Sequence, residues 1–84
     1  MLLVDQGKSA VYETANLEHI RIQYERGAWL IVAGTSLDTY PLACYTAEQD
    51  AKDELTRMIT KIADGEKIYF ATEDRRRKET KSEE

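Results

Sequence analysis

The sequence has little of what small proteins use to reinforce a marginal core. Its 84 residues include one cysteine, Cys44, and one histidine, His19. An intrachain disulfide is therefore excluded, and the lack of a Cys/His cluster argues against a structural zinc site. A chain of this length buries only about 60% of the surface that it exposes when unfolded. Association with further copies is the remaining source of stability, and we predict a homo-oligomer.

Long hydrophobic runs and a basic surplus are also missing. No segment approaches the roughly 20 apolar residues that span a bilayer, and the apolar start ends at Asp5 with no basic residue before it. We therefore expect no membrane segment, no signal peptide and a cytoplasmic location, which a free thiol also favours. The net charge of −4 argues against non-specific binding to nucleic acid or anionic lipid, because both need a basic surface.

The charges divide the chain into two parts. Residues 1–72 hold seven Lys/Arg and eleven Asp/Glu, whereas residues 73–84 hold five of each and no apolar residue. Without apolar side chains to bury, the second part cannot offset the entropy lost on ordering. The sequence therefore predicts a single α+β domain over residues 1–72 and a disordered charged tail over residues 73–84. The tail contains one basic cluster, a candidate nucleic-acid contact formed by Arg75, Arg76, Arg77 and Lys78.

Alternating and apolar segments predict strands at residues 2–4, 9–13, 17–24, 29–33, 37–45 and 68–70. In the third of these, Ile20, Ile22 and Tyr24 share one face, as in a half-buried strand. The fourth is apolar on both faces and follows a loop whose Gly27 can adopt a positive φ, which is typical of a central strand after a hairpin turn. Pro41 places the fifth at a sheet edge or at a bulge, because proline has no backbone donor.

One helix is predicted at about residues 47–64. Its apolar side chains follow one helical stripe: Ala51, Leu55, Met58, Ile59 and Ile62. Thr46 and Gln49 have the spacing of a capping box, and Gly65 is a stop signal. The order of elements predicts an α+β fold: a small antiparallel β-meander of about four to five strands packed against one C-terminal α-helix, with a short final strand.

A single helix covers only one face of a single sheet. If it packs on the face of Ile20 and Ile22, the other face stays uncovered and carries either Trp29 and Ile31 or Leu30 and Val32. We interpret this face as a candidate partner surface, formed by Trp29, Ile31, Arg21 and His19.

Several segments together resemble a known group. They are the start Met1-Leu2-Leu3-Val4-Asp5-Gln6, the segment Asn16-Leu17-Glu18-His19-Ile20, the helix Thr46-Ala47-Glu48-Gln49-Asp50-Ala51-Lys52-Asp53-Glu54-Leu55, and Ile68-Tyr69-Phe70. In this order they resemble a widespread family of small uncharacterised proteins from Firmicutes and their phages. The resemblance covers roughly residues 1–72, and Ala71-Thr72 stands where the family has Met-Pro. It implies the fold and a phage or mobile-element origin, and it transfers no catalytic residue.

Individual residues do not predict an enzyme, and we expect no catalytic, cofactor or metal site. His19 lies on a polar strand face without a neighbouring nucleophile, and Cys44 alternates onto an apolar face, where a buried structural thiol is expected. The aromatic residues would form a stacking platform for bases only with interleaved positive charge, which is sparse here.

We therefore interpret the chain as a non-enzymatic interaction protein that binds a host protein, with an inhibitor of a bacterial anti-phage defence protein as its sharpest form. An oligomer that sequesters a nucleotide signal is the first alternative. A nucleic-acid-binding accessory protein that uses residues 75–78 is the second, although nucleic acid is not the expected partner.

Overall fold

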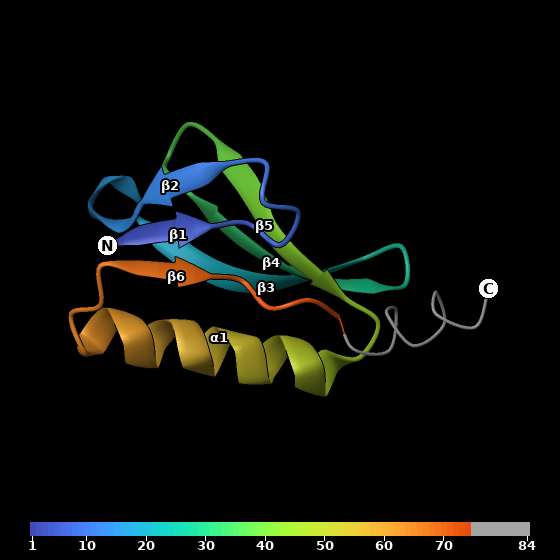
Figure 1. Ribbon diagram of the computed structural model, residues 1–84. Helices are drawn as coiled ribbons and strands as arrows, with labels where there is room; N and C mark the ends of the chain where they lie inside the picture. The colour runs from blue at the N-terminus through green and yellow to red at the C-terminus, as the bar shows by residue number, and fades with distance from the viewer. Residues whose placement is uncertain (75–84) are drawn as a thin grey trace.

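The computed structural model describes residues 1–74, so the basic cluster Arg75–Lys78 lies outside the described residues. The elements are β1 (Leu2–Val4), β2 (Val11–Glu13), the 3₁₀ turn η1 (Thr14–Asn16), β3 (His19–Glu25), β4 (Ala28–Gly34), β5 (Thr39–Tyr45), α1 (Glu48–Ala63) and β6 (Ile68–Phe70). The predicted α+β class, the late helix and the short final strand are confirmed (Figure 1).

The larger sheet is the antiparallel meander β3-β4-β5, with the apolar β4 at its centre as predicted. Arg26 (φ 51°) and Gly27 (φ 79°) both have positive φ, as a two-residue hairpin turn of right-handed twist requires. Pro41 lies in the edge strand β5, and the register there shifts by one residue, so that Ile31 faces Ala43 and Val32 faces Pro41. The proline thus occupies both an edge and a bulge, the two places where its missing N–H costs least.

The smaller sheet, in the order β2-β1-β6, gathers strands that the sequence analysis had placed in one meander. β1 and β2 are antiparallel, whereas β1 and β6 run parallel, with Leu2 beside Ile68 and Val4 beside Phe70. Parallel neighbours need a long crossover connection, and here it runs through β2, η1, the whole larger sheet and the helix. The first and last strands therefore lie side by side (Figure 1).

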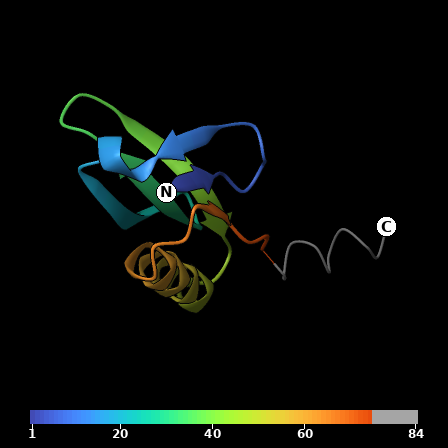
Figure 2. The same cartoon turned by 60° about the vertical axis from the view of Figure 1, so that its left-hand side comes forward.

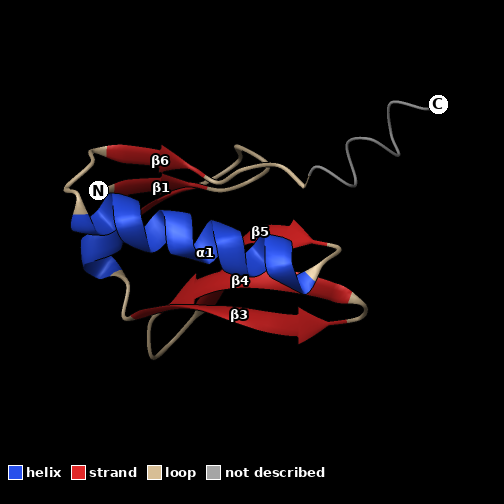
Figure 3. Ribbon diagram, turned by 90° about the horizontal axis from the view of Figure 1, so that it is seen from below, coloured by secondary structure: helices blue, strands red, loops and turns tan. Residues whose placement is uncertain are grey.

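The two sheets and the helix enclose one core. Figure 2 shows α1 nearly end-on below both sheets, and Figure 3 shows it crossing the larger sheet beside β6. The buried apolar cluster draws on every layer: Leu3, Ile31, Ala33, Leu42, Ala43, Tyr45, Ala51, Met58 and Ala71. Because the helix and the smaller sheet together cover one face of the larger sheet, that sheet's other face stays open.

The helix ends where the sequence indicates, but it begins differently. Gly65 (φ 74°) donates to the carbonyl of Ile62, and Glu66 donates to that of Lys61, which together form a Schellman cap. The predicted capping box is wrong: the N-cap is Ala47, without a side-chain cap hydrogen bond. The side chain of Gln49 donates instead to Asp53. Within residues 1–74, no helix has the length and apolar character needed to cross a bilayer.

The buried stripe of the helix is rotated from the predicted one. Ala51, Glu54 and Met58 are its buried residues, whereas Ile59 and Ile62 are 57% and 38% exposed. The helix therefore turns a carboxylate toward the interior, and the surroundings of Glu54 decide what that carboxylate can do.

Candidate functional site

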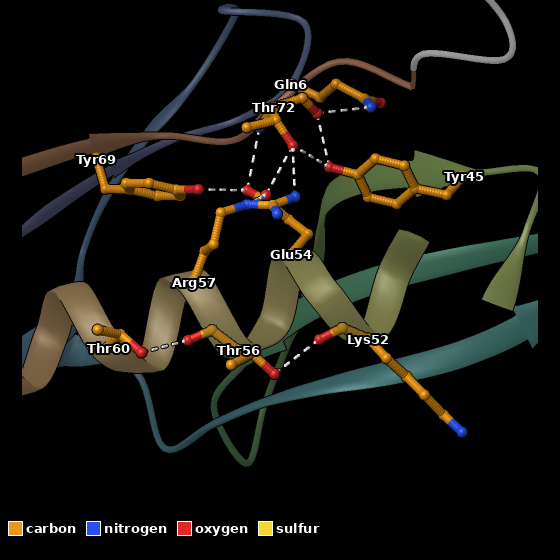
Figure 4. A network of polar contacts seen from close by, with 9 residues as sticks. All are labelled: Gln6, Tyr45, Lys52, Glu54, Thr56, Arg57, Thr60, Tyr69 and Thr72. Atoms are coloured by element: carbon orange, nitrogen blue, oxygen red, sulfur yellow. Dashed lines mark hydrogen bonds and ion pairs between the residues drawn. The ribbon is translucent and has the colours of Figure 1, made fainter. Parts of the chain in front are cut away.

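The side chain of Glu54 is fully buried where α1 packs against the segment after β6 (Figure 4). Its Oε1 accepts from Arg57 Nε at 2.9 Å and from the Thr72 hydroxyl at 2.6 Å. Its Oε2 accepts from the Tyr69 hydroxyl and from the Thr72 amide, both at 3.0 Å. Four donors thus surround the carboxylate, and one of them belongs to a cation, which satisfies a buried charge. We call these four residues the Glu54 cluster.

The cluster continues through Thr72 into the larger sheet. The Tyr45 hydroxyl donates to the Thr72 carbonyl at 2.6 Å, and the Gln6 side-chain amide donates to the same oxygen at 3.0 Å. Gln6 also donates to the Cys44 carbonyl and accepts from the Cys44 amide, so that its side chain binds the edge of β5 as a peptide group would. The segment after β6 is thereby fixed to the helix and to β5.

The pKa values of the cluster follow from this burial. Burial raises the pKa of Tyr45 and, with the charge of Glu54, that of Tyr69. Partial burial acts to lower the pKa of Arg57, but the hydrogen bond and charge of Glu54 outweigh it and raise that pKa. At neutral pH the cluster therefore holds an ionised Arg57 and a neutral Tyr69, and the neighbouring Tyr45 is neutral too.

The chemistry open to the cluster is limited by its own hydrogen bonds. Each oxygen of Glu54 already accepts two hydrogen bonds, which leaves no acceptor directed at a substrate. An acidic depression of about 350 Å³ opens beside it, where Asp50, Asp53 and Glu73 join Arg57. Among the described residues, no group of three His, Cys, Asp or Glu side chains could hold a metal ion. We interpret the Glu54 cluster as a structural joint.

A surface of a different kind lies on the outer face of the smaller sheet. The inner row of this sheet is Tyr12, Leu3 and Tyr69, which pack toward the core. Because side chains alternate along each strand, the neighbouring residues point outward. They form two rows across β2, β1 and β6: Val11, Val4 and Phe70 in one, and Glu13, Leu2 and Ile68 in the other. We call the five apolar members (Leu2, Val4, Val11, Ile68 and Phe70) the apolar face.

Four of the five residues of the apolar face are exposed, and they come from all three strands. Val11 is 57% exposed, Phe70 51%, Ile68 46% and Leu2 40%, whereas Val4 at the centre is only 7% exposed. Scattered apolar side chains are normal on a protein surface, but contiguous ones mark interaction sites. Register places Ile68 beside Leu2, and both Val11 and Phe70 beside Val4, so the four exposed side chains surround the largely covered Val4 in one patch.

The residues predicted as a partner surface lie on two different faces of the larger sheet. Trp29 and Ile31 point to the core side: Ile31 is fully buried, and Trp29 packs against the core and stacks on Tyr24 with ring centroids 4.5 Å apart. Ile31 is thus wrong as a contact residue, because its side chain is in the core. Arg21 and His19 are exposed on the opposite side.

The open face carries the other predicted pair, Leu30 and Val32. Together with Pro41 these residues form the floor of a depression of about 550 Å³, whose rim includes Arg21 and Arg26. Cys44 faces Leu30 across the ladder and is half-buried.

The tyrosines do not gather into a stacking platform. Tyr12 contacts Tyr40 with ring centroids 5.3 Å apart, and Tyr24 contacts Trp29. Tyr45 and Tyr69 belong to the hydrogen-bond network around Thr72 and Glu54.

The folded part of the chain extends two residues past the predicted boundary at residue 72. Asp74 is 4% exposed, and its carboxylate accepts from the amide of Thr46 at 3.1 Å, the same residue that had been predicted to cap the helix. The candidate nucleic-acid contact Arg75, Arg76, Arg77 and Lys78 lies beyond the described residues and stays a prediction.

Comparison with known proteins gave no match: no protein family, no curated protein and no solved structure is similar to this chain. The predicted family membership therefore stays a prediction.

The apolar face and Glu54 were both missed in the sequence. Glu54 lies three residues after Ala51 and four before Met58, so helical spacing alone places it between two buried residues. The alternate residues of the short strands carried the signal of the apolar face, since Leu2 and Val4, and Ile68 and Phe70, are two apart.

Proposed function

We propose that this chain is a non-enzymatic interaction protein that binds a partner protein through the apolar face. The observation that carries the proposal is the contiguous exposure of Leu2, Val11, Ile68 and Phe70 on three adjacent strands. An exposed patch of this kind is costly to keep in water and is typical of a surface that is covered in a complex. The occupied hydrogen bonds of Glu54 support the absence of a catalytic role.

The charge of the described residues defines the chemistry of the partner. Residues 1–74 hold seven Lys/Arg and thirteen Asp/Glu, a net charge of −6. A complementary partner presents apolar side chains ringed by basic ones, because opposite potentials accelerate encounter and like charges oppose it. The expected complex therefore forms more slowly as the salt concentration rises.

The test uses two matched serine substitutions. Phe70→Ser removes the largest side chain of the apolar face, whereas Leu37→Ser removes an apolar side chain that is 88% exposed in the loop before β5. We expect the wild-type chain and Leu37→Ser to retain the same stoichiometric partner from a lysate of the source organism, and Phe70→Ser to lose it. For the purified pair, the dissociation constant should rise about tenfold or more in Phe70→Ser.

Three results would contradict the proposal. They are the absence of a stoichiometric partner for the wild-type chain, equal retention by both variants, and a change in the oligomeric state of the free protein caused by Phe70→Ser. The last result would mean that the apolar face joins copies of this chain.

A narrower proposal concerns the identity of the partner. Small size, acidity and the resemblance to phage proteins support an inhibitor of a bacterial anti-phage defence protein. Expression of the chain in a bacterium that carries such a defence system should restore plaque formation, and Phe70→Ser should abolish the rescue. Unchanged immunity against every system tested would oppose this identity without affecting the proposed binding face.

The depression on the open face supports a second candidate function, the binding of a small anionic molecule. Its volume of about 550 Å³ is in the range of ligand pockets, and its lining sets two cations, Arg21 and Arg26, against one carboxylate, Glu25, beside apolar side chains. A nucleotide at 100 times its dissociation constant should stabilise the fold by about 2.7 kcal/mol. A thermal-shift screen of nucleotides without any shift would exclude this function.

A further inference from the structure

The two sheets together have four edges, and three of them are protected against pairing. The edge strands β2 and β6 of the smaller sheet are three residues long. β5 carries Pro41 and a bulge, and the side chain of Gln6 binds its edge at Cys44. Short strands, prolines, bulges and covering groups are the usual means of preventing edge pairing.

The fourth edge, β3, has none of these features. It is seven residues long, contains no proline, and pairs with β4 without a register shift from His19 to Glu25. The hairpin turn makes Glu25 and Ala28 a hydrogen-bonded pair, and bonding alternates along an antiparallel ladder. The backbone N–H and C=O groups of Ile20, Ile22 and Tyr24 therefore point away from β4, toward the open edge.

The side chains of β3 are self-complementary when the strand is paired with itself. Arg21, Gln23 and Glu25 form a row on the open face, where Arg21 donates to Gln23 at 3.3 Å and Gln23 donates to Glu25 at 3.1 Å. In an antiparallel pair centred on Gln23, Arg21 of each copy lies opposite Glu25 of the other. On the inner side, Ile22 lies opposite Tyr24, which is 59% exposed in the single chain.

The neighbouring registers lack this match. Centring the pair on Ile22 places Arg21 opposite Gln23, and centring it on Arg21 places two arginines opposite each other. Like charges in directly opposed positions destabilise a sheet, whereas opposite charges stabilise it.

We propose that two copies of this chain pair antiparallel along β3 about a two-fold axis at Gln23. The two larger sheets then join into one sheet of six strands, and the interface is the same patch on both copies. The pairing satisfies the open backbone groups of Ile20, Ile22 and Tyr24. It involves a sheet edge that is separate from the apolar face, so it does not depend on the proposed function.

Charge reversal tests both the dimer and its register. Arg21→Glu alone or Glu25→Arg alone opposes like charges twice in each dimer, because the axis repeats every contact. We expect the dissociation constant of the dimer, measured by sedimentation equilibrium, to rise about tenfold or more for each single variant. The double variant Arg21→Glu/Glu25→Arg and an equimolar mixture of the two single variants should both recover dimers of wild-type affinity.

Lys52→Glu is the matched control. It reverses the charge of an exposed residue of α1, and the dissociation constant of the dimer should not change. A wild-type chain that stays monomeric over the whole concentration series would overturn the proposal. An unchanged dissociation constant in either single variant would overturn the β3 register. A double variant that does not regain the wild-type dissociation constant would overturn it too. Circular dichroism of each variant confirms that the chain is folded.

Discussion

Glu54 is an ionisable side chain with no exposed surface, and it occupies a helix position that an apolar residue would normally take. Its carboxylate is the one acceptor that Arg57, Tyr69 and Thr72 share. Replacing a whole buried ion pair by apolar residues can be neutral, but removing Glu54 alone leaves the Tyr69 hydroxyl and the Thr72 amide without an acceptor. The contribution of Glu54 to stability therefore lies in the donors that it satisfies.

A substitution at Glu54 should be far more costly than one at its neighbour. Glu54→Gln keeps the shape but turns an amide donor toward groups that already donate, so we expect the free energy of unfolding to fall by about 2–3 kcal/mol. Glu54→Ala should cost about 2–5 kcal/mol, because the Tyr69 hydroxyl and the Thr72 amide lose their acceptor, while the half-exposed Arg57 can turn to water. Asp53→Asn, at an exposed position, should stay within about 0.5 kcal/mol. Urea unfolding of the three variants measures the difference, and equal stability of Glu54→Gln and Asp53→Asn would contradict this account.

The tyrosines of the network predict a loss of stability at high pH. Burial raises the pKa of Tyr45 and Tyr69 above the ordinary value of 10.0. The unfolded chain therefore releases these protons at a lower pH than the folded chain does. The contribution of the two tyrosines to stability is complete below about pH 10, and the free energy of unfolding falls as the pH rises further. Urea unfolding between about pH 9 and pH 11 measures the slope.

The variant Tyr45→Phe should flatten this slope. It should also lower stability at neutral pH by about 1 kcal/mol, because the Thr72 carbonyl loses the hydrogen bond from the Tyr45 hydroxyl. Tyr24→Phe is the control, since that side chain is exposed. A slope that is the same in both variants would show that Tyr45 does not cause the loss.

Elements whose signal is local could be predicted, and elements defined by distant partners could not. The helix and β3, β4 and β5 follow from periodicity and turn residues within a short stretch of sequence. The parallel pairing of β1 and β6 was not foreseen, because three-residue strands carry no register signal. The prediction of the capping box was wrong because of a distant partner: the amide of Thr46 donates to Asp74, 28 residues away in the sequence.

The candidate site was predicted less well than the fold. Alternation identified two faces of β4 but could not decide which one is covered, so Ile31 was offered as a contact although it is in the core. The apolar face was missed because it exists only once Leu2, Val11 and Phe70 are assembled from three separate strands.

Two glycines at the ends of elements should differ in their tolerance of alanine. At Gly65 an added Cβ would meet nothing within 4 Å, so only the positive φ of 74° opposes the change. At Gly34, the last residue of β4, the Cβ would lie 2.5 Å from the backbone oxygen of Asp38, which cannot rotate away. We expect Gly65→Ala to cost about 1 kcal/mol and Gly34→Ala about 2 kcal/mol or more in urea unfolding. The reverse order would contradict the close contact between Gly34 and the loop before β5.

At the scale of the whole molecule, the two proposed roles fall on two separate surfaces. The edge of β3 belongs to the larger sheet, and the apolar face belongs to the smaller one. A dimer formed along β3 therefore carries two copies of the apolar face. Two linked sites raise the effective concentration for a second binding event, so a partner with two epitopes would bind more tightly than either site alone allows.

The parallel pairing of β1 with β6 also has a consequence for the order of folding. The hairpins β3–β4 and β4–β5 join neighbours in the sequence, whereas the β1–β6 ladder closes a loop of almost the entire described chain. Loop closure costs entropy that earlier contacts must offset, so we expect the larger sheet and helix to form first and β6 to join β1 last. The complete apolar face is then assembled only in that final step. A chain without β6 in place lacks Ile68 and Phe70 on this face, so we expect a partner that needs all three strands to bind only fully folded molecules.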